Sequence, residues 1–396
     1  MISADEALKI IKERIQPLQS VTISLPRALG KTLAENIISN DNVPPFDNSA
    51  MDGYAVRARE IAAAPVLLKI VGEIAAGTIF SGNLDTNQAV AIMTGSKIPV
   101  SCDTVVPQEM TERCGDDKVK ILNSLPVGTN VRKAGKDIQK SEKVFGKGQL
   151  LRSPEIGVLA SLGHKFVNVR QTPTVSVLAT GNELVELDKQ LTDGQIRNSN
   201  AYSLCSIIRE SGCEAFNIGI ARDNPEDLRN KLRKGLDADM LLTTGGVSVG
   251  KYDLVQEELK ALGVDIHFWK VNIKPGMPLL FGTWNGKAIF GLPGNPVSAL
   301  VTFSHFVRPA LFAMMGRNDS PMRFQAQILH DINKNDRKRH FMRGILEDIN
   351  GVLSVKSTGM QDSNILTSLT RANCLIIIPE EKDVVKAGEQ VEVELL

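Results

Sequence analysis

A loop rich in glycine and hydroxyl side chains, residues 243–250, carries the clearest chemical signal in this sequence. It lies between a short apolar run and a segment compatible with a helix. Several main-chain N–H groups are therefore expected to point toward one place, where the helix dipole adds positive potential. This arrangement suits a phosphate contacted by Gly245, Gly246 and Ser248, with Asp253 placed to reach it through a divalent cation. A glycine turn that only requires positive φ explains the loop equally well when it is considered alone.

Two more acidic residues follow predicted strands in the same part of the chain: Glu183 comes after residues 175–179, and Asp223 after residues 216–220. The carboxyl ends of parallel strands share one edge of a sheet, so these two residues and Asp253 are expected to converge there. Clustered carboxylates repel one another unless a cation holds them together, and oxygen ligands near phosphate suit Mg²⁺. The trio therefore predicts a magnesium site, although any one of the three also fits a helix N-cap or a solvated loop.

Positive charge and a second turn follow further along the chain. Lys270 and Lys274 end a predicted strand and lead into a loop stiffened by prolines, where their point charges suit an oxyanion. Asn295 is placed as the N-cap of the next helix, with a proline after it. The N–H groups of Val297 and Ser298 are then expected to face outward and to form a second anion pocket. Ordinary strand-end lysines and a purely structural cap are the alternative explanations.

Two polar clusters lie outside this region. Residues 46–56 hold two acids, an amide and a hydroxyl between apolar runs, with Gly53 allowing a tight turn. Near the C-terminus, residues 337–343 are basic and residues 359–363 form a polar turn. A basic run is usually a solvated face, but this one is also able to supply Arg343 to an oxyanion that arrives from another domain.

Composition and charge exclude several classes of protein. The 396 residues carry 46 basic and 45 acidic side chains, so no overall field recruits nucleic acid or an acidic membrane surface. No run approaches the roughly 20 apolar residues that a membrane-spanning helix needs, and charged residues interrupt the N-terminal segment, which predicts an amphipathic helix rather than a signal peptide. The cysteines form no CxxC pair, and the histidines show no ligand spacing. We therefore expect a cytoplasmic protein without a zinc site or a disulfide framework.

Local patterns of apolar, polar and glycine residues divide the chain into four predicted domains. Residues 172–317 alternate apolar runs with helical segments, which predicts a doubly wound, mostly parallel α/β domain with ligand loops at the carboxyl ends of its strands. Residues 44–133 are short β-like runs punctuated by glycine and predict a β-rich domain, and residues 318–396 predict a small β-barrel or sandwich. The remaining segments, 1–43 and 134–171, are expected to form an elongated mixed domain, the first largely helical and the second containing one helix.

Five segments in this order and spacing resemble the molybdopterin molybdenumtransferase (MoeA) family, to which the gephyrin E domain is related: FDNSAMDGYAV, TGNELV, TTGGVSVG with its following Asp, FWK with KPG three residues later, and GLPGNPVSA. The resemblance implies insertion of molybdenum from molybdate into adenylylated molybdopterin, with a divalent cation, and release of AMP and molybdenum cofactor. It also implies an elongated four-domain homodimer in which the second domain of one subunit brings its Asp52 segment toward the α/β domain of the other. The implied working partner is the molybdopterin adenylyltransferase.

The resemblance assigns functional roles residue by residue. The family's functional positions fall on Asp52, Thr94, Glu183, Asp223, Asp253, Lys270, Lys274, Arg343 and Ser363, and its molybdate would sit near Pro278 and Ser298. Residues 97–103 and Lys136 also differ from the family's pattern, but one departure matters most: Met277 stands where a lysine is common. Lys274, Arg343 and main-chain N–H groups are therefore expected to carry more of the neutralisation of molybdate. The alternatives are the adenylyltransferase that shares the α/β domain, a non-catalytic scaffold of the same architecture, and a nucleotide pyrophosphatase or amidase with a related module.

Overall fold

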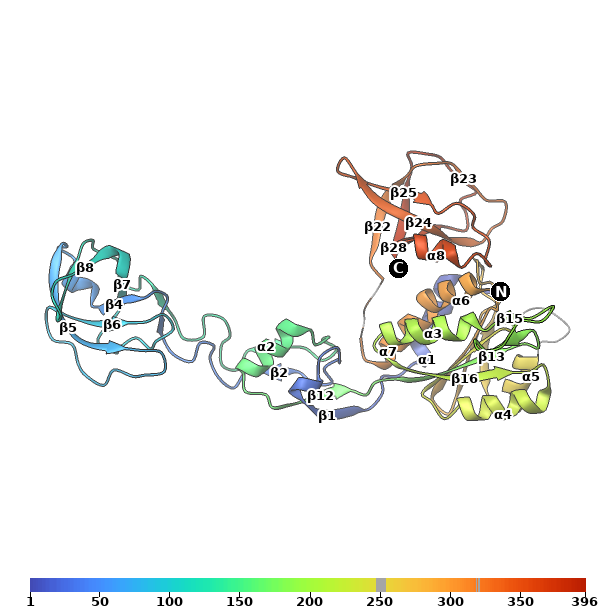
Figure 1. Cartoon of the computed structure of the whole chain (residues 1–396), viewed down its shortest axis with the longest axis horizontal. Helices are drawn as coiled ribbons and strands as arrows, with labels where there is room; N and C mark the ends of the chain where they lie inside the picture. The colour runs from blue at the N-terminus through green and yellow to red at the C-terminus, as the bar shows by residue number, and fades with distance from the viewer. Residues whose placement is uncertain (247–253, 318, 320) are drawn as a thin grey trace.

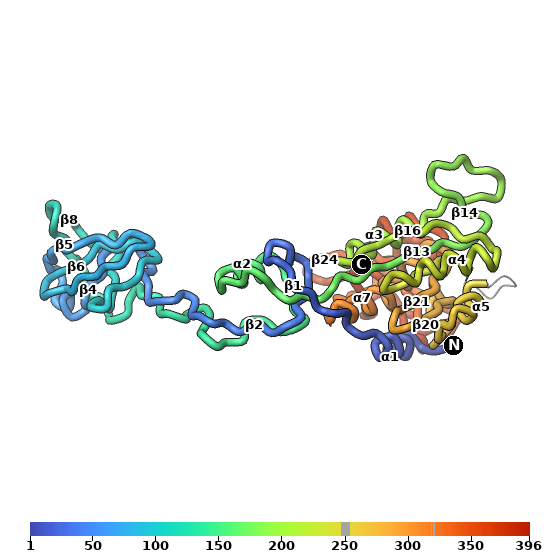
Figure 2. Tube along the Cα trace, turned by 90° about the horizontal axis from the view of Figure 1, so that it is seen from below, coloured from blue at the N-terminus to red at the C-terminus, as the bar shows by residue number. Residues whose placement is uncertain are grey.

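The chain folds into an elongated molecule with separate bodies along its length (Figure 1). The computed structural model describes residues 1–246, 254–317, 319 and 321–396. A β-rich unit lies at one end, a small mixed unit lies in the middle, and the α/β sheet lies at the other end beside the C-terminal barrel. Figure 2 shows the two passages of the chain that run side by side between the β-rich unit and the middle unit.

The middle unit is built from two segments that are distant in the sequence. Strand β1 (Ser20–Ser24) pairs antiparallel with β12 (Phe166–Arg170), and β2 (Ile37–Ile38) pairs with β11 (Lys143–Phe145). Helix α2 (Ser153–Ser161) packs against them, and the apolar side chains of all these elements form one core cluster. The segments before and after the β-rich unit thus close the middle unit between them.

Helix α1 (Ala4–Arg14) does not belong to the middle unit. It starts at Ser3, whose Oγ accepts a hydrogen bond from the Glu6 N–H at 3.1 Å. Ile11 and its apolar neighbours are buried in the core of the α/β domain, and the chain after the helix is extended. The prediction of a largely helical segment 1–43 is wrong, because the apolar face of this one short helix is buried against the sheet.

The same helix makes an acid-sensitive contact with the C-terminal barrel. Asp5 accepts two hydrogen bonds from the Arg339 guanidinium, at 2.7 and 2.8 Å, and they hold the pKa of the Asp5 carboxyl below its ordinary value. The contact therefore stabilises the fold above about pH 4 and is lost as the pH falls further, when the carboxylate takes up a proton. Asp5→Asn is expected to lower the melting temperature near neutral pH, by an amount that shrinks as the pH falls below about 4. A difference that stays the same at every pH would contradict this assignment.

Short strands form the β-rich unit, as the sequence predicts. The order in its sheet is β7-β4-β6-β5-β9-β8, and apolar side chains are buried on both of its faces. Gly53 begins β4, the strand next to the edge strand β7, and glycine is required there because a Cβ would lie 2.0 Å from the Val106 carbonyl oxygen. The strand bounds are β4 (Gly53–Val56), β5 (Val66–Ile74), β6 (Gln88–Ile92), β7 (Thr104–Pro107), β8 (Thr111–Arg113) and β9 (Lys118–Ile121).

A six-stranded sheet forms the α/β domain, in the order β16-β13-β17-β21-β20-β18. All its strands run in the same direction except β20, so the predicted doubly wound, mostly parallel sheet is confirmed. The strands are β13 (Thr174–Thr180), β16 (Glu214–Ala221), β17 (Met240–Thr244), β18 (Asp265–Trp269), β20 (Leu280–Trp284) and β21 (Lys287–Leu292). The helices are α3 (Ser199–Glu210), α4 (Pro225–Gly235), α5 (Leu254–Ala261), α6 (Pro296–Thr302), a π-helical segment (Phe303–Val307) and α7 (Arg308–Met314).

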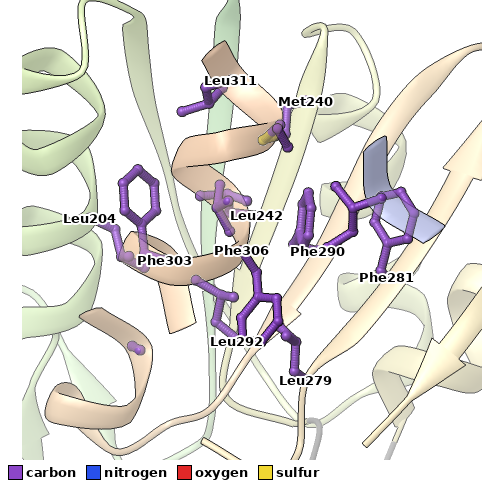
Figure 3. Packing of buried hydrophobic residues seen from close by; sticks show 14 of the residues in the cluster. Leu204, Met240, Leu242, Leu279, Phe281, Phe290, Leu292, Phe303, Phe306 and Leu311 are labelled. Atoms are coloured by element: carbon purple, nitrogen blue, oxygen red, sulfur yellow. The ribbon is translucent and has the colours of Figure 1, made fainter. Parts of the chain in front are cut away.

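The central strands are buried on both faces because their apolar side chains alternate between two layers. In β17, Met240 and Leu242 pack with α1, α3 and the α6–α7 run, whereas Leu241 packs with α4 and α5 on the other face. Figure 3 shows the first layer, which includes Phe306 from the π-helical segment. The run Pro296–Met314 is long and apolar enough to cross a membrane, but 72% of its most apolar window is buried in this core, so it is a core helix.

Sequence patterns did not predict strand β20. It pairs antiparallel with β21 through a two-residue turn at Asn285 and Gly286, whose φ angles are 49° and 79°. Asn-Gly with both residues at positive φ is the typical turn of a tight β-hairpin. The signal for this reversed strand is therefore present in the sequence.

Five strands close into the C-terminal barrel, as predicted. Strand β24 pairs with both β25 and β26, and β22 and β28 complete the ring. The two-residue strand β19 (Ile273–Lys274) of the α/β domain also pairs with β24, so the loop after β18 reaches the barrel. The strand bounds are β22 (Arg323–Ile328), β24 (Arg339–Ile349), β25 (Val352–Ser357), β26 (Cys374–Ile378) and β28 (Gln390–Leu395).

Candidate functional site

A cavity of about 280 Å³ opens at the carboxyl edge of the parallel strands. It is lined by the ends of β13 and β17 and by the starts of α3 and α6, which is where ligands bind in doubly wound sheets. Three residues predicted for the site, Glu183, Gly245 and Asn295, line it together. Asn364 from the C-terminal domain also lines it, so the cavity lies where two domains meet.

The glycine turn after β17 is described as far as Gly246. Gly245 and Gly246 have φ angles of 89° and 62°, in the region that favours glycine. The Gly245 N–H donates to the Leu292 carbonyl oxygen at 3.1 Å. This N–H holds the turn against β21 and is not available to an anion. Ser248 and Asp253, the other predicted members of the loop, lie outside the described residues.

The turn tolerates no side chain at Gly245. A Cβ there would lie 2.6 Å from the Thr180 carbonyl oxygen and 3.0 Å from its Oγ1. Gly245→Ala is therefore expected to lower the free energy of unfolding by about 2–4 kcal/mol, through positive-φ strain and overlap together. Gly212→Ala is the matched control, because Gly212 has a φ of 84° and open space around it, and it should lose only about 1 kcal/mol. Urea denaturation measures both, and equal losses would exclude the overlap.

Glu183 and Asp223 lie on adjacent loops that hydrogen bond to each other. The Asn182 N–H donates to Asp223 Oδ2 at 3.3 Å, and the Asp223 N–H donates to Asn182 Oδ1 at 3.2 Å. The structure thus brings two of the three predicted carboxylates to neighbouring loops at one edge. Among the described residues, no three histidine, cysteine, aspartate or glutamate side chains are grouped to hold a metal, and the third predicted ligand, Asp253, lies outside them.

The two predicted lysines lie beyond β18. Lys270 has a φ of 89°, and its Nζ is 4.1 Å from the centre of the Trp269 ring. Lys274 Nζ is 3.6 Å from Asp336 Oδ2 in the C-terminal domain, and His340 Nε2 is 2.7 Å from the other oxygen of that carboxylate. Because the Lys274 side chain is 57% exposed, solvent screens this ion pair and the pair is weak.

The loop after the lysines folds back onto α6. A Cβ at Gly276 would lie 2.4 Å from Thr302 Cγ2 and 3.6 Å from the Ser298 carbonyl oxygen, so this glycine permits a close approach. Met277 and Pro278 follow directly in the same loop. Ser298 is buried, with 3% of its surface exposed. The helix that carries Ser298 therefore contacts the loop that is predicted to border molybdate.

A turn from the C-terminal domain covers the start of α6. Asn295 Nδ2 donates to Ser363 Oγ at 2.9 Å, and the Val297 N–H donates to the Ser363 carbonyl oxygen at 3.1 Å. Asn295 occupies the predicted N-cap position, but its side chain makes no capping hydrogen bond. The prediction of a free Val297 N–H is wrong, because Ser363 accepts from it. Two predicted site residues, Asn295 and Ser363, are nevertheless in direct contact.

Arg343 is not a surface cation. It is 1% exposed, and it donates from Nε to Ser368 Oγ at 3.0 Å and from Nη2 to the Asp362 carbonyl oxygen at 3.1 Å. Burial lowers the pKa of its guanidinium. In this structure its donors order the turn that carries Ser363, and a direct contact between Arg343 and an oxyanion stays a prediction.

Asp52 and Thr94 form a hydrogen-bonded pair in the β-rich unit. Asp52 Oδ1 accepts from the Thr94 N–H at 2.7 Å and from Thr94 Oγ1 at 2.9 Å, and both bonds lower the pKa of the Asp52 carboxyl. Asp52 also lines a cavity of about 480 Å³ together with Glu73 and Asp117. Figure 1 places this unit at the opposite end of the chain from the α/β sheet, so a single chain does not bring Asp52 to the cavity beside Glu183.

Two residues that sequence reasoning missed hold the edge together. Arg222 Nη1 donates to three carbonyl oxygens of the loop 181–184, at 3.0–3.4 Å. Asn200 Nδ2 donates to Thr244 Oγ1 at 2.9 Å and to the Gly294 carbonyl oxygen at 2.7 Å, which joins the ends of two strand-to-helix turns. Their position near strand ends was the available signal, but their partners are distant in the sequence.

Sequence models of three regions of one protein family match the chain. They are described as the MoeA N-terminal region (domain I and II), over residues 2–163, the probable molybdopterin binding domain, over residues 176–313, and the MoeA C-terminal region (domain IV), over residues 325–396. Together they span most of the sequence.

Relatives and solved structures match the full length. The molybdopterin molybdenumtransferase of Haemophilus influenzae is 35% identical over 399 residues, which cover 100% of this chain and 98% of that protein. Molybdopterin molybdenumtransferase 2 of Mycobacterium tuberculosis is 35% identical over 404 residues, which cover 99% of each chain. A crystal structure of the molybdopterin biosynthesis MoeA protein from Pyrococcus horikoshii is similar with a TM-score of 0.86 and 30% identity, and the match covers 100% of both chains.

Proposed function

We propose that this chain, which belongs to the molybdopterin molybdenumtransferase (MoeA) family, inserts molybdenum from molybdate into adenylylated molybdopterin and releases AMP and molybdenum cofactor. The observation that carries the proposal is the cavity at the carboxyl edge of the sheet, where Glu183, Gly245 and Asn295 meet from three separate loops. Carboxylates flank this edge after β13 and β16, and lysines follow β18. A site with an acidic side and a cationic side suits a substrate that carries both a phosphoanhydride and a metal-binding group.

Mg²⁺ is the cation that we assign to the acidic side, held by Glu183, Asp223 and Asp253. The first two offer hard oxygen ligands on loops that their mutual hydrogen bonds and Arg222 hold in place, and this donor set fits the ion. When bound, the cation stabilises negative charge on the leaving phosphate. Asn200 keeps the two neighbouring turns together, so the phosphates meet binding groups in fixed positions.

Molybdate is the substrate that we assign to the cationic side. Lys270 and Lys274 supply positive charge, and the loop with Pro278 packs on the helix that carries Ser298. Met277 adds no charge to this loop. We therefore expect Lys274 to leave Asp336 and to bind molybdate. Its charge then replaces part of the charge of the lysine that is absent at Met277.

A homodimer accounts for the distance between Asp52 and the cavity. In a symmetric pair, the β-rich unit of one chain reaches the α/β domain of the other, and each of the two sites then draws on both chains. The Asp52–Thr94 pair is exposed, as a group that meets a second chain needs to be. The elongated shape fits this arrangement, because the β-rich unit of a compact chain would not reach the α/β domain of a partner.

We propose that the reaction takes place in the cytoplasm, next to the enzyme that makes its substrate. In the described chain all five cysteines are unpaired, which suits a reducing compartment. Adenylylated molybdopterin is a reactive intermediate, so we propose the molybdopterin adenylyltransferase as a working partner that hands it over.

Supplying the purified protein with adenylylated molybdopterin, molybdate and Mg²⁺ tests the proposal. We expect AMP and active cofactor to appear together, and AMP to stay bound to molybdopterin when molybdate or Mg²⁺ is left out. Failure to form cofactor in the complete mixture would contradict the proposal. A parallel mixture of ATP and molybdopterin tests the adenylyltransferase alternative, and we expect no adenylylated product from it.

A further inference from the structure

Two side-chain amides line the cavity at the carboxyl edge, and the reaction proposed above does not explain all of their polar atoms. Asn198 is the N-cap of α3 and is 1% exposed, and Asn200 lies two residues further along; both line the cavity. Within the described residues, Asn198 Nδ2 and Asn200 Oδ1 are buried and have no hydrogen-bond partner. Burying a polar atom unpaired is costly, and native proteins keep few such atoms.

Main-chain contacts fix which atom of each amide is unpaired. Asn198 Oδ1 accepts from the Ala201 N–H at 3.2 Å, and an N–H group is never an acceptor, so the oxygen and nitrogen of this amide cannot be exchanged. Asn200 Nδ2 donates to the Gly294 carbonyl oxygen at 2.7 Å, and a carbonyl oxygen is never a donor. Two residues that line the cavity therefore hold one buried unpaired donor, on Asn198, and one buried unpaired acceptor, on Asn200.

We propose that Asn198 and Asn200 recognise the edge of a nitrogen heterocycle in the substrate. An aminopyrimidine edge carries a ring nitrogen that accepts beside an amino group that donates, which complements this pair of amides. The inference rests on the proposed function, because adenylylated molybdopterin has two such edges, one on adenine and one on the pterin. Asn198 donates to the ring nitrogen, and Asn200 accepts from the amino group while its other atom holds the two turns.

Two variants of Asn198 remove the amide N–H group and keep the helix cap. Asn198→Asp is isosteric and has no donor when ionised, whereas Asn198→Ser is neutral and its shorter side chain does not place a donor where the amide N–H lies. Both retain an oxygen for the Ala201 N–H, and Asp and Ser cap helices about as well as Asn. The control is Asn217→Asp, an exposed residue outside the cavity whose Oδ1 also accepts a main-chain N–H, from Gly219 at 3.0 Å. All three variants are expected to melt close to the unmodified protein. A large drop in melting temperature for both Asn198 variants would mean a structural role and would overturn the proposal.

Equilibrium binding of AMP, ribose 5-phosphate and molybdopterin is the decisive measurement. We expect Asn198→Ser to weaken either AMP or molybdopterin by about tenfold, the effect of one lost hydrogen bond, and to leave ribose 5-phosphate unchanged. A loss for AMP assigns the amides to adenine, and a loss for molybdopterin assigns them to the pterin. Unchanged binding of both, or an equal loss for ribose 5-phosphate, would overturn the inference.

The unmodified protein separates this inference from the proposed function. If it forms cofactor while the Asn198 variants bind both probes normally, only the inference about the heterocycle fails. If the unmodified protein binds neither AMP nor molybdopterin and forms no cofactor, the proposed function fails, and the assignment of Asn198 and Asn200 fails with it.

Discussion

Asp223→Asn is expected to lower the rate of cofactor formation by on the order of 1,000-fold while leaving the fold intact. The substitution removes the charge that we assign to the magnesium site, but the new amide oxygen still accepts the Asn182 N–H that now bonds to Asp223. The two loops therefore stay paired, and the loss reports on charge at the site. Release of AMP and appearance of cofactor in the same reaction mixture measure the effect.

A neighbouring acid on the same surface provides the control for that experiment. Glu226→Gln removes a negative charge from the exposed first turn of α4, where the residue lies close in sequence to Asp223 but is not one of the three acids that we assign to the metal. Its rate is expected to stay within about twofold of the unmodified protein. Near-normal turnover by Asp223→Asn, or an equal loss in both variants, would remove Asp223 from the metal site.

Mixing two inactive variants is expected to restore activity. Asp52→Ala and Asp223→Ala each disable one half of a site that we propose to be shared between two chains. In a mixed dimer, one site then carries both substitutions and the other carries neither. After co-expression, half of the dimers are mixed and each has one intact site, so the mixture should recover about a quarter of the unmodified activity.

The same experiment distinguishes the shared site from its alternative. If Asp52 acted within its own chain, every site in every dimer would carry one substitution, and the mixture would stay as inactive as its components. Each variant alone, at the same total concentration, is the baseline. Sedimentation of the unmodified protein as a monomer would also contradict the shared site.

The position of the site was predictable because it depends on local patterns. Apolar runs that alternate with helical segments place Glu183, Asp223 and Gly245 after strands, and the direction of the strands then brings them to one edge. The α/β sheet followed from the same patterns, including the alternation in β17 that buries both faces. Among the strands of this sheet in the described residues, β20 alone was missed, although the Asn-Gly turn beside it marks a reversal.

The contacts that complete the site were not predictable, because they join residues across domains. Ser363 takes the Val297 N–H and the Asn295 amide only because the barrel docks beside α6. Arg343 lies in a basic run, and such a run usually predicts a solvated surface. Its burial depends on the turn that folds over it. Single-sequence patterns carry no information about such pairings, which arise when separately folded surfaces meet.

The double passage of the chain between the β-rich unit and the middle unit limits how that end can swing. The Val43 N–H donates to the Ile138 carbonyl oxygen at 2.8 Å, and the Gly135 N–H donates to the Pro44 carbonyl oxygen at 2.9 Å, so the outgoing and returning strands are bonded to each other. A single tether swivels freely, whereas two bonded strands resist torsion and leave bending as the easy motion. We therefore expect the β-rich unit, and Asp52 with it, to move mainly by bending of this double passage rather than by rotation about it.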